Sequence, residues 1–117
     1  MDFLSHMFGS PLPALTVQEV NERLKNGKRP LVVDVRQPEE YRQGHIVGAK
    51  LVPLGELSQR MKELPKDREI VCVCASGSRS SSATKMLVGA GYTAINMSGG
   101  MSTWQRAGLS IKKGSAM

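Results

Sequence analysis

Short, largely apolar runs recur along the chain, separated by segments in which apolar residues fall at helical spacing. Three of the runs are Leu31–Val35, Ile70–Cys74 and Ala94–Met97, and a fourth, Ala49–Val52, is followed by Pro53. Runs of this length without polar alternation are typical of strands buried on both faces, which is the pattern of a parallel sheet. We therefore expect these runs to be strands of one mostly parallel sheet.

The segments between these runs carry helix signals. Thr16 and Glu19 have the spacing of a capping box, and Pro38 suits the first turn of a helix. Apolar residues then recur every three or four positions, as they do on one face of a helix. The expected helices run from Thr16 to Gly27, from Pro38 to Gly44, around Leu57 and Met61, from near Ser80 to Gly91, and from Met101 to Ala107. This alternation of strands and helices predicts an α/β sandwich.

The length of 117 residues and the hydrophobic content of 40% suit one domain with one packed core. We expect a flexible N-terminal segment at residues 1–10, the domain at residues 11–110 and a C-terminal tail at residues 111–117. No apolar run reaches the roughly 20 residues of a membrane span. The first ten residues also lack the features of a secretory signal. We therefore expect a cytoplasmic protein that does not contact membranes.

The net charge of +6 is unevenly distributed. Residues 1–69 hold 11 Lys/Arg and all 10 Asp/Glu, whereas residues 70–117 hold 5 Lys/Arg and no acidic residue. Positive potential over the second part favours small anionic substrates or acidic partner surfaces. The basic residues are scattered and are not interleaved with aromatic residues, so we do not expect nucleic-acid binding. A chain this small and this charged is expected to be a monomer.

The two cysteines, Cys72 and Cys74, lie two positions apart in one predicted strand. Their side chains would share a face but lie roughly 7 Å apart along the strand, which is too far for a relaxed disulfide. Free thiols indicate a reducing compartment. These two cysteines and the distant His6 and His45 make no metal site, and no nucleotide or haem motif occurs. We therefore expect neither a metal nor a cofactor.

Cys74 ends a predicted strand and begins a loop that contains Gly77 and Arg79, after which a helix follows. Small loop residues let successive backbone N–H groups turn inward as a nest, the helix N-terminus adds positive potential, and Arg79 adds a full charge. All three stabilise negative charge on sulfur, so the Cys74 thiolate is the predicted reactive group. Cys72 has no such loop, and we expect it to be a small core residue.

The sequence resembles the rhodanese homology family over most of its length, from about Ala14 to Leu109. The resemblance rests on an ordered set of matching pieces, which are Leu31-Val32-Val33-Asp34-Val35-Arg36, Glu39-Glu40-Tyr41, Gly44-His45-Ile46-Val47-Gly48-Ala49, Cys74-Ala75-Ser76-Gly77-Ser78-Arg79-Ser80, and Gly99-Gly100-Met101 with Trp104. It implies a five-stranded parallel sheet flanked by helices, and a catalytic cysteine that becomes a persulfide.

The resemblance also implies roles for individual residues. Cys74 would be the nucleophile, and Arg79 would be the cationic residue of its loop. The residues implied to bind the substrate are Ala75, Ser76, Gly77, Ser78, Arg79 and Ser80. The implied reaction carries a sulfane sulfur from thiosulfate, or from a related persulfide donor, through a Cys74 persulfide to a thiol or cyanide acceptor. A protein thiol is a further candidate partner.

Two other activities are compatible with a strand, a cysteine loop, an arginine and a helix. Phosphatases and arsenate reductases of the same fold family use a loop one residue longer, Cys-x5-Arg, whereas the spacing from Cys74 to Arg79 is Cys-x4-Arg. Phosphoester hydrolysis also benefits from a carboxylic acid near the loop, and Glu39 or Glu40 could approach it only through the fold. The second alternative is a sulfur carrier or docking module that serves a partner protein without turnover of its own.

Residues outside the loop carry weaker signals. Arg36, at the end of another strand, is a candidate substrate-binding residue, although a structural ion pair with Asp34 or hydrogen bonds to a neighbouring loop are the interpretation that we favour. We expect His45 to order a loop and not to act as a base. Trp104 is expected in the core, with its edge as a candidate pocket wall.

Overall fold

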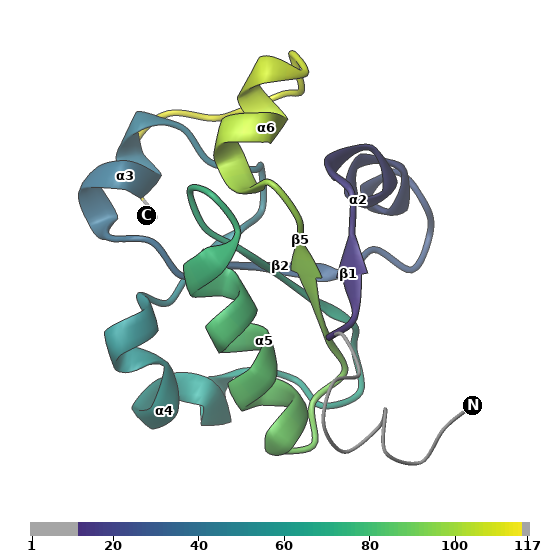
Figure 1. Cartoon of the computed structure of the whole chain (residues 1–117), viewed down its shortest axis with the longest axis vertical. Helices are drawn as coiled ribbons and strands as arrows, with labels where there is room; N and C mark the ends of the chain where they lie inside the picture. The colour runs from purple at the N-terminus through teal and green to yellow at the C-terminus, as the bar shows by residue number, and fades with distance from the viewer. Residues whose placement is uncertain (1–11, 116–117) are drawn as a thin grey trace.

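The computed structural model describes residues 12–115 (Figure 1). The flexible segment expected at residues 1–10 lies outside the described residues, as do residues 116–117 of the expected tail. The strands are β1 (Ala14–Leu15), β2 (Leu31–Asp34), β3 (Lys50–Leu51), β4 (Ile70–Val73) and β5 (Ala94–Met97). The helices are α2 (Val17–Leu24), α3 (Pro38–Gln43), α4 (Leu57–Arg60), α5 (Ser78–Gly89) and α6 (Gly100–Arg106), with the short 3-10 helices η1 (Leu54–Glu56) and η2 (Met61–Glu63) on either side of α4.

All five strands form one parallel sheet in the order β1-β5-β4-β2-β3. Strand β4 is at the centre, where Cys72 is in register with Val33 of β2 and with Asn96 of β5. Every residue of β4 is buried, as expected of an apolar run covered on both faces. The predicted α/β sandwich with a parallel five-stranded sheet is therefore confirmed.

Helices cover both faces of the sheet (Figure 1). On one face, Leu57 of α4 and Leu87 of α5 pack against alternate strand residues such as Cys72. On the other face, Val20 of α2 and Trp104 of α6 pack against the remaining strand residues. Trp104 is 1% exposed and its Nε1 donates to the Ser110 carbonyl at 2.9 Å, which confirms it as a core residue. Among residues 12–115, none of the helices has the length and apolar character needed to cross a membrane.

The apolar pattern did not predict strand β1 or the exact start of helix α5. Strand β1 has only two residues, Ala14–Leu15, and it exists because these residues pair with β5. Helix α5 begins at Ser78, two residues before the expected Ser80, because Gly77 adopts a φ of +104° and allows the chain to turn directly into the helix.

The chain after α6 returns to the region around α3. Lys112 forms an antiparallel bridge with His45, in which the two backbone N–H groups donate to the opposite carbonyls at 2.9 and 2.8 Å. The Gly114 N–H then donates to the Arg42 carbonyl at 2.9 Å. This part of the expected tail is thus hydrogen-bonded to the segment that follows β2.

Candidate active site

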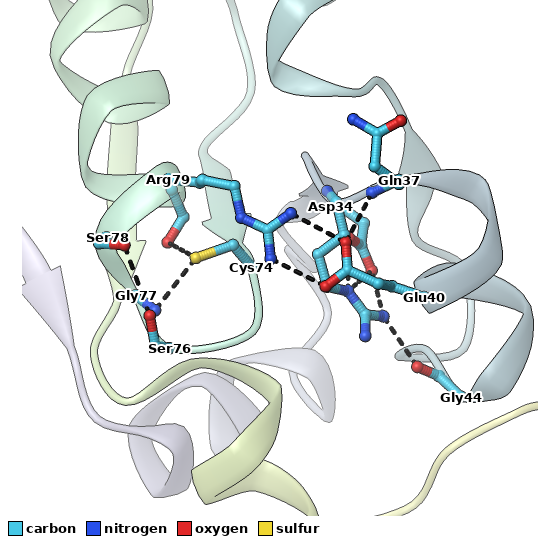
Figure 2. Close-up of polar contacts among 11 residues, drawn as sticks. Asp34, Gln37, Glu40, Gly44, Cys74, Ser76, Gly77, Ser78 and Arg79 are labelled. Atoms are coloured by element: carbon cyan, nitrogen blue, oxygen red, sulfur yellow. Dashed lines mark hydrogen bonds and ion pairs between the residues drawn. The ribbon is translucent and has the colours of Figure 1, made fainter.

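Cys74 immediately follows β4, at the carboxyl edge of the sheet. This edge is where parallel sheets form their binding sites, because the loops that leave neighbouring strands meet there. The loop of residues 74–77 is short, so α5 begins close to the cysteine and its N-terminal turn faces the sulfur (Figure 2). The sequence predicted this arrangement of strand, loop and helix.

The sulfur atom of Cys74 accepts hydrogen bonds from the loop and from α5 (Figure 2). The Gly77 N–H donates to Cys74 Sγ at 3.0 Å, and the Ser80 hydroxyl donates to it at 3.3 Å. Backbone N–H groups of Ser76 and Ser80 also stabilise the ionised sulfur. The cradle expected from the loop composition therefore surrounds the sulfur, and its side-chain donor, Ser80, is fully buried.

The two cysteines differ in pKa because their sulfur atoms have different surroundings. Burial alone would raise the pKa of Cys74, but hydrogen bonds from the Ser80 hydroxyl and from backbone N–H groups outweigh that effect and leave the pKa below its ordinary value. Burial raises the pKa of Cys72 to about 11, because no comparable set of hydrogen-bond donors is described around its sulfur. Both cysteines are free thiols, but only Cys74 is prepared to react as a thiolate.

The remaining predicted loop residues differ in exposure. Ser76 and Ser78 are exposed at the rim and their hydroxyl oxygens lie 3.4 Å apart. Ala75 is partly buried, and its carbonyl accepts a hydrogen bond from the Ser102 N–H at 3.0 Å. The rim is therefore polar and open, whereas the interior of the loop is held by backbone contacts.

Helix α6 and strand β5 support the loop from behind. The Met101 N–H donates to the Cys74 carbonyl at 2.8 Å. A Cβ atom at Gly100, whose φ is +62°, would lie 2.5 Å from the Ala75 carbonyl oxygen, so only glycine permits this approach. The Asn96 side chain donates from Nδ2 to the Gly77 carbonyl at 3.3 Å. Sequence analysis missed Asn96, because nothing in the sequence spacing connects it to the loop.

Arg79 forms an ion pair that the sequence did not predict. Its NH1 and NH2 groups each donate to one oxygen of the Glu40 carboxylate at 2.8 Å. The hydrogen bonds from Arg79 are the main reason that the pKa of Glu40 falls to about 2. The fold therefore brings an acidic side chain to the loop, as only a tertiary contact could, but this carboxylate remains ionised at neutral pH.

Arg36 lies in a separate buried ion pair. Its Nε donates to Asp34 Oδ1 at 3.0 Å, and its NH2 group donates to Asp34 Oδ2 and to the Gly44 carbonyl, both at 2.8 Å. These hydrogen bonds favour a structural role for Arg36, as the partner of Asp34. Substrate binding by Arg36 stays a prediction. His45 is buried, stacks on Tyr41 and bonds through Nδ1 to the Tyr41 carbonyl, as expected of a residue that orders a loop.

The structure describes no group of three or more His, Cys, Asp or Glu side chains in residues 12–115 that could hold a metal ion. The groups that the structure describes at the carboxyl edge are one activated thiolate, a nest of N–H donors and the guanidinium of Arg79, which is paired with Glu40. Such a site can hold a sulfur-centred anion and can attack an electrophilic atom with the cysteine sulfur.

Comparison with known proteins identifies the family. The model of the Rhodanese-like domain matches residues 16–107. A sulfurtransferase of Allochromatium vinosum is 40% identical over 95 residues, which cover 80% of this chain and 89% of that protein. The crystal structure of a rhodanese-related protein from Thermoplasma volcanium matches with a TM-score of 0.81 at 28% identity, covering 86% of this chain and 97% of that chain. The structure of a thiosulfate sulfurtransferase from Pseudomonas aeruginosa also gives a TM-score of 0.81, at 30% identity, covering 89% of this chain and 21% of that one. Sequence and structure therefore agree that the chain belongs to the rhodanese-like domain family.

Proposed function

We propose that this protein is a sulfurtransferase that carries a sulfane sulfur as a persulfide on Cys74. The donor is thiosulfate or a related persulfide, and the acceptor is a thiol or cyanide. The observation that carries the proposal is the cradle of hydrogen-bond donors around Cys74 Sγ, which lowers the pKa of this thiol although the residue is buried. The chain also belongs to a family that includes a sulfurtransferase, which supports sulfur transfer as the reaction of this activated thiol.

In the first half-reaction, the Cys74 thiolate attacks the outer sulfur of thiosulfate. A bond forms between this sulfur and Sγ, the bond to the sulfite sulfur breaks, and sulfite leaves with the electron pair. The negative charge then lies on the outer sulfur of the persulfide. The N–H nest of residues 75–80 is expected to stabilise that charge.

In the second half-reaction, a thiolate or cyanide attacks the outer sulfur of the persulfide. The sulfur–sulfur bond breaks and Cys74 leaves as a thiolate, which regains the hydrogen bonds from Gly77 and Ser80 seen in the free protein. A low thiol pKa assists this step as well, because a more stable thiolate is a better leaving group. The two half-reactions predict ping-pong kinetics.

The proposal is tested by intact mass after incubation with thiosulfate, together with thiocyanate formation from cyanide. We expect wild type and Cys72→Ala to gain the mass of one sulfur atom and to turn over, and Cys74→Ser to do neither. Cys72→Ala is the matched control because it removes the other thiol, which is buried within strand β4 and has a pKa of about 11. Retention of the sulfur gain in Cys74→Ser would refute the assignment.

The same experiment separates turnover from carriage. A sulfur gain without thiocyanate formation would identify a sulfur carrier that needs a partner protein as acceptor. Phosphatase chemistry is not favoured, because the carboxyl group described in contact with the loop, that of Glu40, has a pKa of about 2 and has no proton to donate at neutral pH.

A further inference from the structure

The ion pair between Glu40 and Arg79 lies beside the reactive sulfur. Arg79 is on the first turn of α5, and Glu40 is on the first turn of α3, 39 positions earlier in the sequence. Figure 2 shows the Arg79 side chain extending past Cys74 to the Glu40 carboxylate. The pKa of Arg79 is raised mainly by its hydrogen bonds to Glu40 and, to a smaller extent, by the thiolate of Cys74, so the cation and the sulfur interact electrostatically. Any anion that approaches Cys74 therefore meets this pair.

The carboxylate of Glu40 is held in place independently of Arg79. Glu40 is the third residue of α3, and its Oε1 accepts a hydrogen bond from the Gln37 N–H at 3.0 Å, as in a capping box. The guanidinium of Arg79 has no second partner among the described contacts, because the hydrogen bonds from its NH1 and NH2 groups are both to Glu40. Opening the pair thus requires Arg79 to move while Glu40 stays.

The pair is accessible to a ligand. The side chains of Arg79 and Glu40 are 36% and 34% exposed, in contrast with the buried pair of Arg36 and Asp34, which are 6% and 0% exposed. An anion in solution can therefore compete for the guanidinium of Arg79, but it must displace a carboxylate that is already bound through two hydrogen bonds.

We propose that Glu40 determines the charge selectivity of the site, because it neutralises Arg79 in the resting protein and competes with anionic substrates for that cation. An oxyanion donor such as thiosulfate binds only at the cost of breaking the pair. A persulfide of a thiol carries a single charge on its outer sulfur and no oxyanion group that could pair with the guanidinium, so it depends less on Arg79 and bears less of this cost. The inference names the substrate class of the proposed sulfurtransferase and rests on that proposal, but the competition itself is a property of the free site.

The competition can be measured without sulfur transfer, from the alkylation of Cys74 by two reagents of equal chemistry and different charge. In a Cys72→Ala background Cys74 is the remaining cysteine of the two in the chain. The ratio of the second-order rate constants for iodoacetate and iodoacetamide then reports the potential at the sulfur. Any change in the reactivity of the thiol itself cancels in this ratio.

Glu40→Gln is the informative variant, because glutamine also accepts the capping hydrogen bond at this helix position and removes only the charge. We expect it to raise the iodoacetate to iodoacetamide ratio by about three- to fivefold, as suits a partly exposed ion pair. Glu39→Gln removes the same charge from the same helical turn at an exposed position, and we expect less than about a 1.5-fold change because of screening.

Arg79→Met completes the test. Arg79→Met should lower the ratio of the iodoacetate rate to the iodoacetamide rate. In the Arg79→Met background, the further change Glu40→Gln should alter this ratio no more than Glu39→Gln does, because the Glu40 carboxylate then has no cation to neutralise. An unchanged or lower ratio in Glu40→Gln, or an equal rise in Glu39→Gln, would overturn the proposal. None of these outcomes depends on whether the protein is a sulfurtransferase.

The effect of Glu40 on substrate selectivity is measured by comparing the kinetics of two sulfur donors that differ in charge. Thiosulfate is a dianion and methanethiosulfonate a monoanion, and both offer an outer sulfur to the same attack. We expect Glu40→Gln to lower KM for thiosulfate by about threefold, to lower it less for methanethiosulfonate, and to leave kcat nearly unchanged. An equal effect on the two donors would contradict charge selectivity, whereas absence of turnover in wild type as well would count against the proposed function and leave the alkylation result standing.

Discussion

At the scale of single residues, the reactivity of Cys74 depends on Ser80. The Ser80 hydroxyl is the only side-chain donor to the sulfur that the described contacts include, and it lies fully buried on the first turns of α5. A hydrogen bond to an ionised group is worth more than one between neutral groups, because the donor compensates charge. The hydroxyl therefore contributes directly to the thiolate fraction at neutral pH.

Replacing Ser80 by alanine should raise the pKa of Cys74, since the thiolate loses a donor and the neutral thiol loses little. The iodoacetamide alkylation profile would shift to higher pH, and at pH 7 the rate would fall by about three- to tenfold. Ser82→Ala, on the exposed side of the same helix, is the control and should leave the profile unchanged. A coincident profile for Ser80→Ala would show that the backbone N–H groups suffice.

The sequence predicted the residues that act near their own position and missed those that act across the fold. The place of Gly77 in the nest follows from spacing, because backbone nests and helix termini are local structures. The full charge expected from Arg79 is instead paired with Glu40, and the causes that lower the pKa of Cys74 are hydrogen bonds from Ser80, Gly77 and Ser76. Glu40 is 39 positions from Arg79, so no sequence pattern connects it to the loop. The presence of an acidic residue at this position is already accounted for by the capping of α3. Asn96 is hidden in the same way within a strand.

At the scale of elements, the loop after β4 and the start of α6 form one backbone-packed unit. Hydrogen bonds from Met101 and Ser102 to the carbonyls of Cys74 and Ala75 join them. Gly100 permits the contact because it lacks a Cβ and can adopt a positive φ. The sequence predicted a turn at Gly99-Gly100 but could not show that this turn touches the reactive loop.

Gly100→Ala should destabilise the protein and impair sulfur loading together. The added Cβ would meet the Ala75 and Cys74 carbonyl oxygens at 2.5 and 2.6 Å, and the left-handed backbone adds strain. We expect a loss of about 2 kcal/mol or more in the free energy of unfolding, measured by urea denaturation. Gly89→Ala is the matched control, because nothing lies within 4 Å of its Cβ and its backbone is helical. That change should be neutral or slightly stabilising.

The elements themselves were predictable to the extent that they are buried. Strand β4 and strand β5 were expected within one residue of their bounds, because runs covered on both faces have few polar residues. Strand β1 could not be found from the apolar pattern, since two residues at a sheet edge carry no periodicity. Its existence depends on pairing with β5, which is a tertiary contact.

At the scale of the whole molecule, the net charge of +6 and the absence of acidic residues from positions 70–117 lead us to expect a positive long-range field. Only one acidic group, Glu40, is described in contact with the loop, and it comes from α3. Long-range attraction of small anions therefore persists while the local cation is neutralised.

Thiosulfate kinetics should therefore depend on salt. Raising the ionic strength from about 20 to about 200 mM should lower kcat/KM for thiosulfate by about threefold, because the Debye length shortens to less than the molecular radius. The rate of iodoacetamide alkylation, which involves an uncharged reagent, should change little over the same range. Equal sensitivity of the two reactions would point to a salt effect on Cys74 itself.

The support of the Cys74 loop by Met101 and Ser102 has a consequence for the newly made protein. During synthesis, Cys74 leaves the ribosome before the residues that hold its carbonyls, and strand β5 with Asn96 also follows it. A partly made chain therefore contains the cysteine but not the folded loop, and its thiol has the reactivity of any unstructured cysteine. If the proposed function holds, the N–H nest can stabilise a persulfide on Cys74 only after α6 has docked against the loop, so sulfur loading would report that this contact has formed.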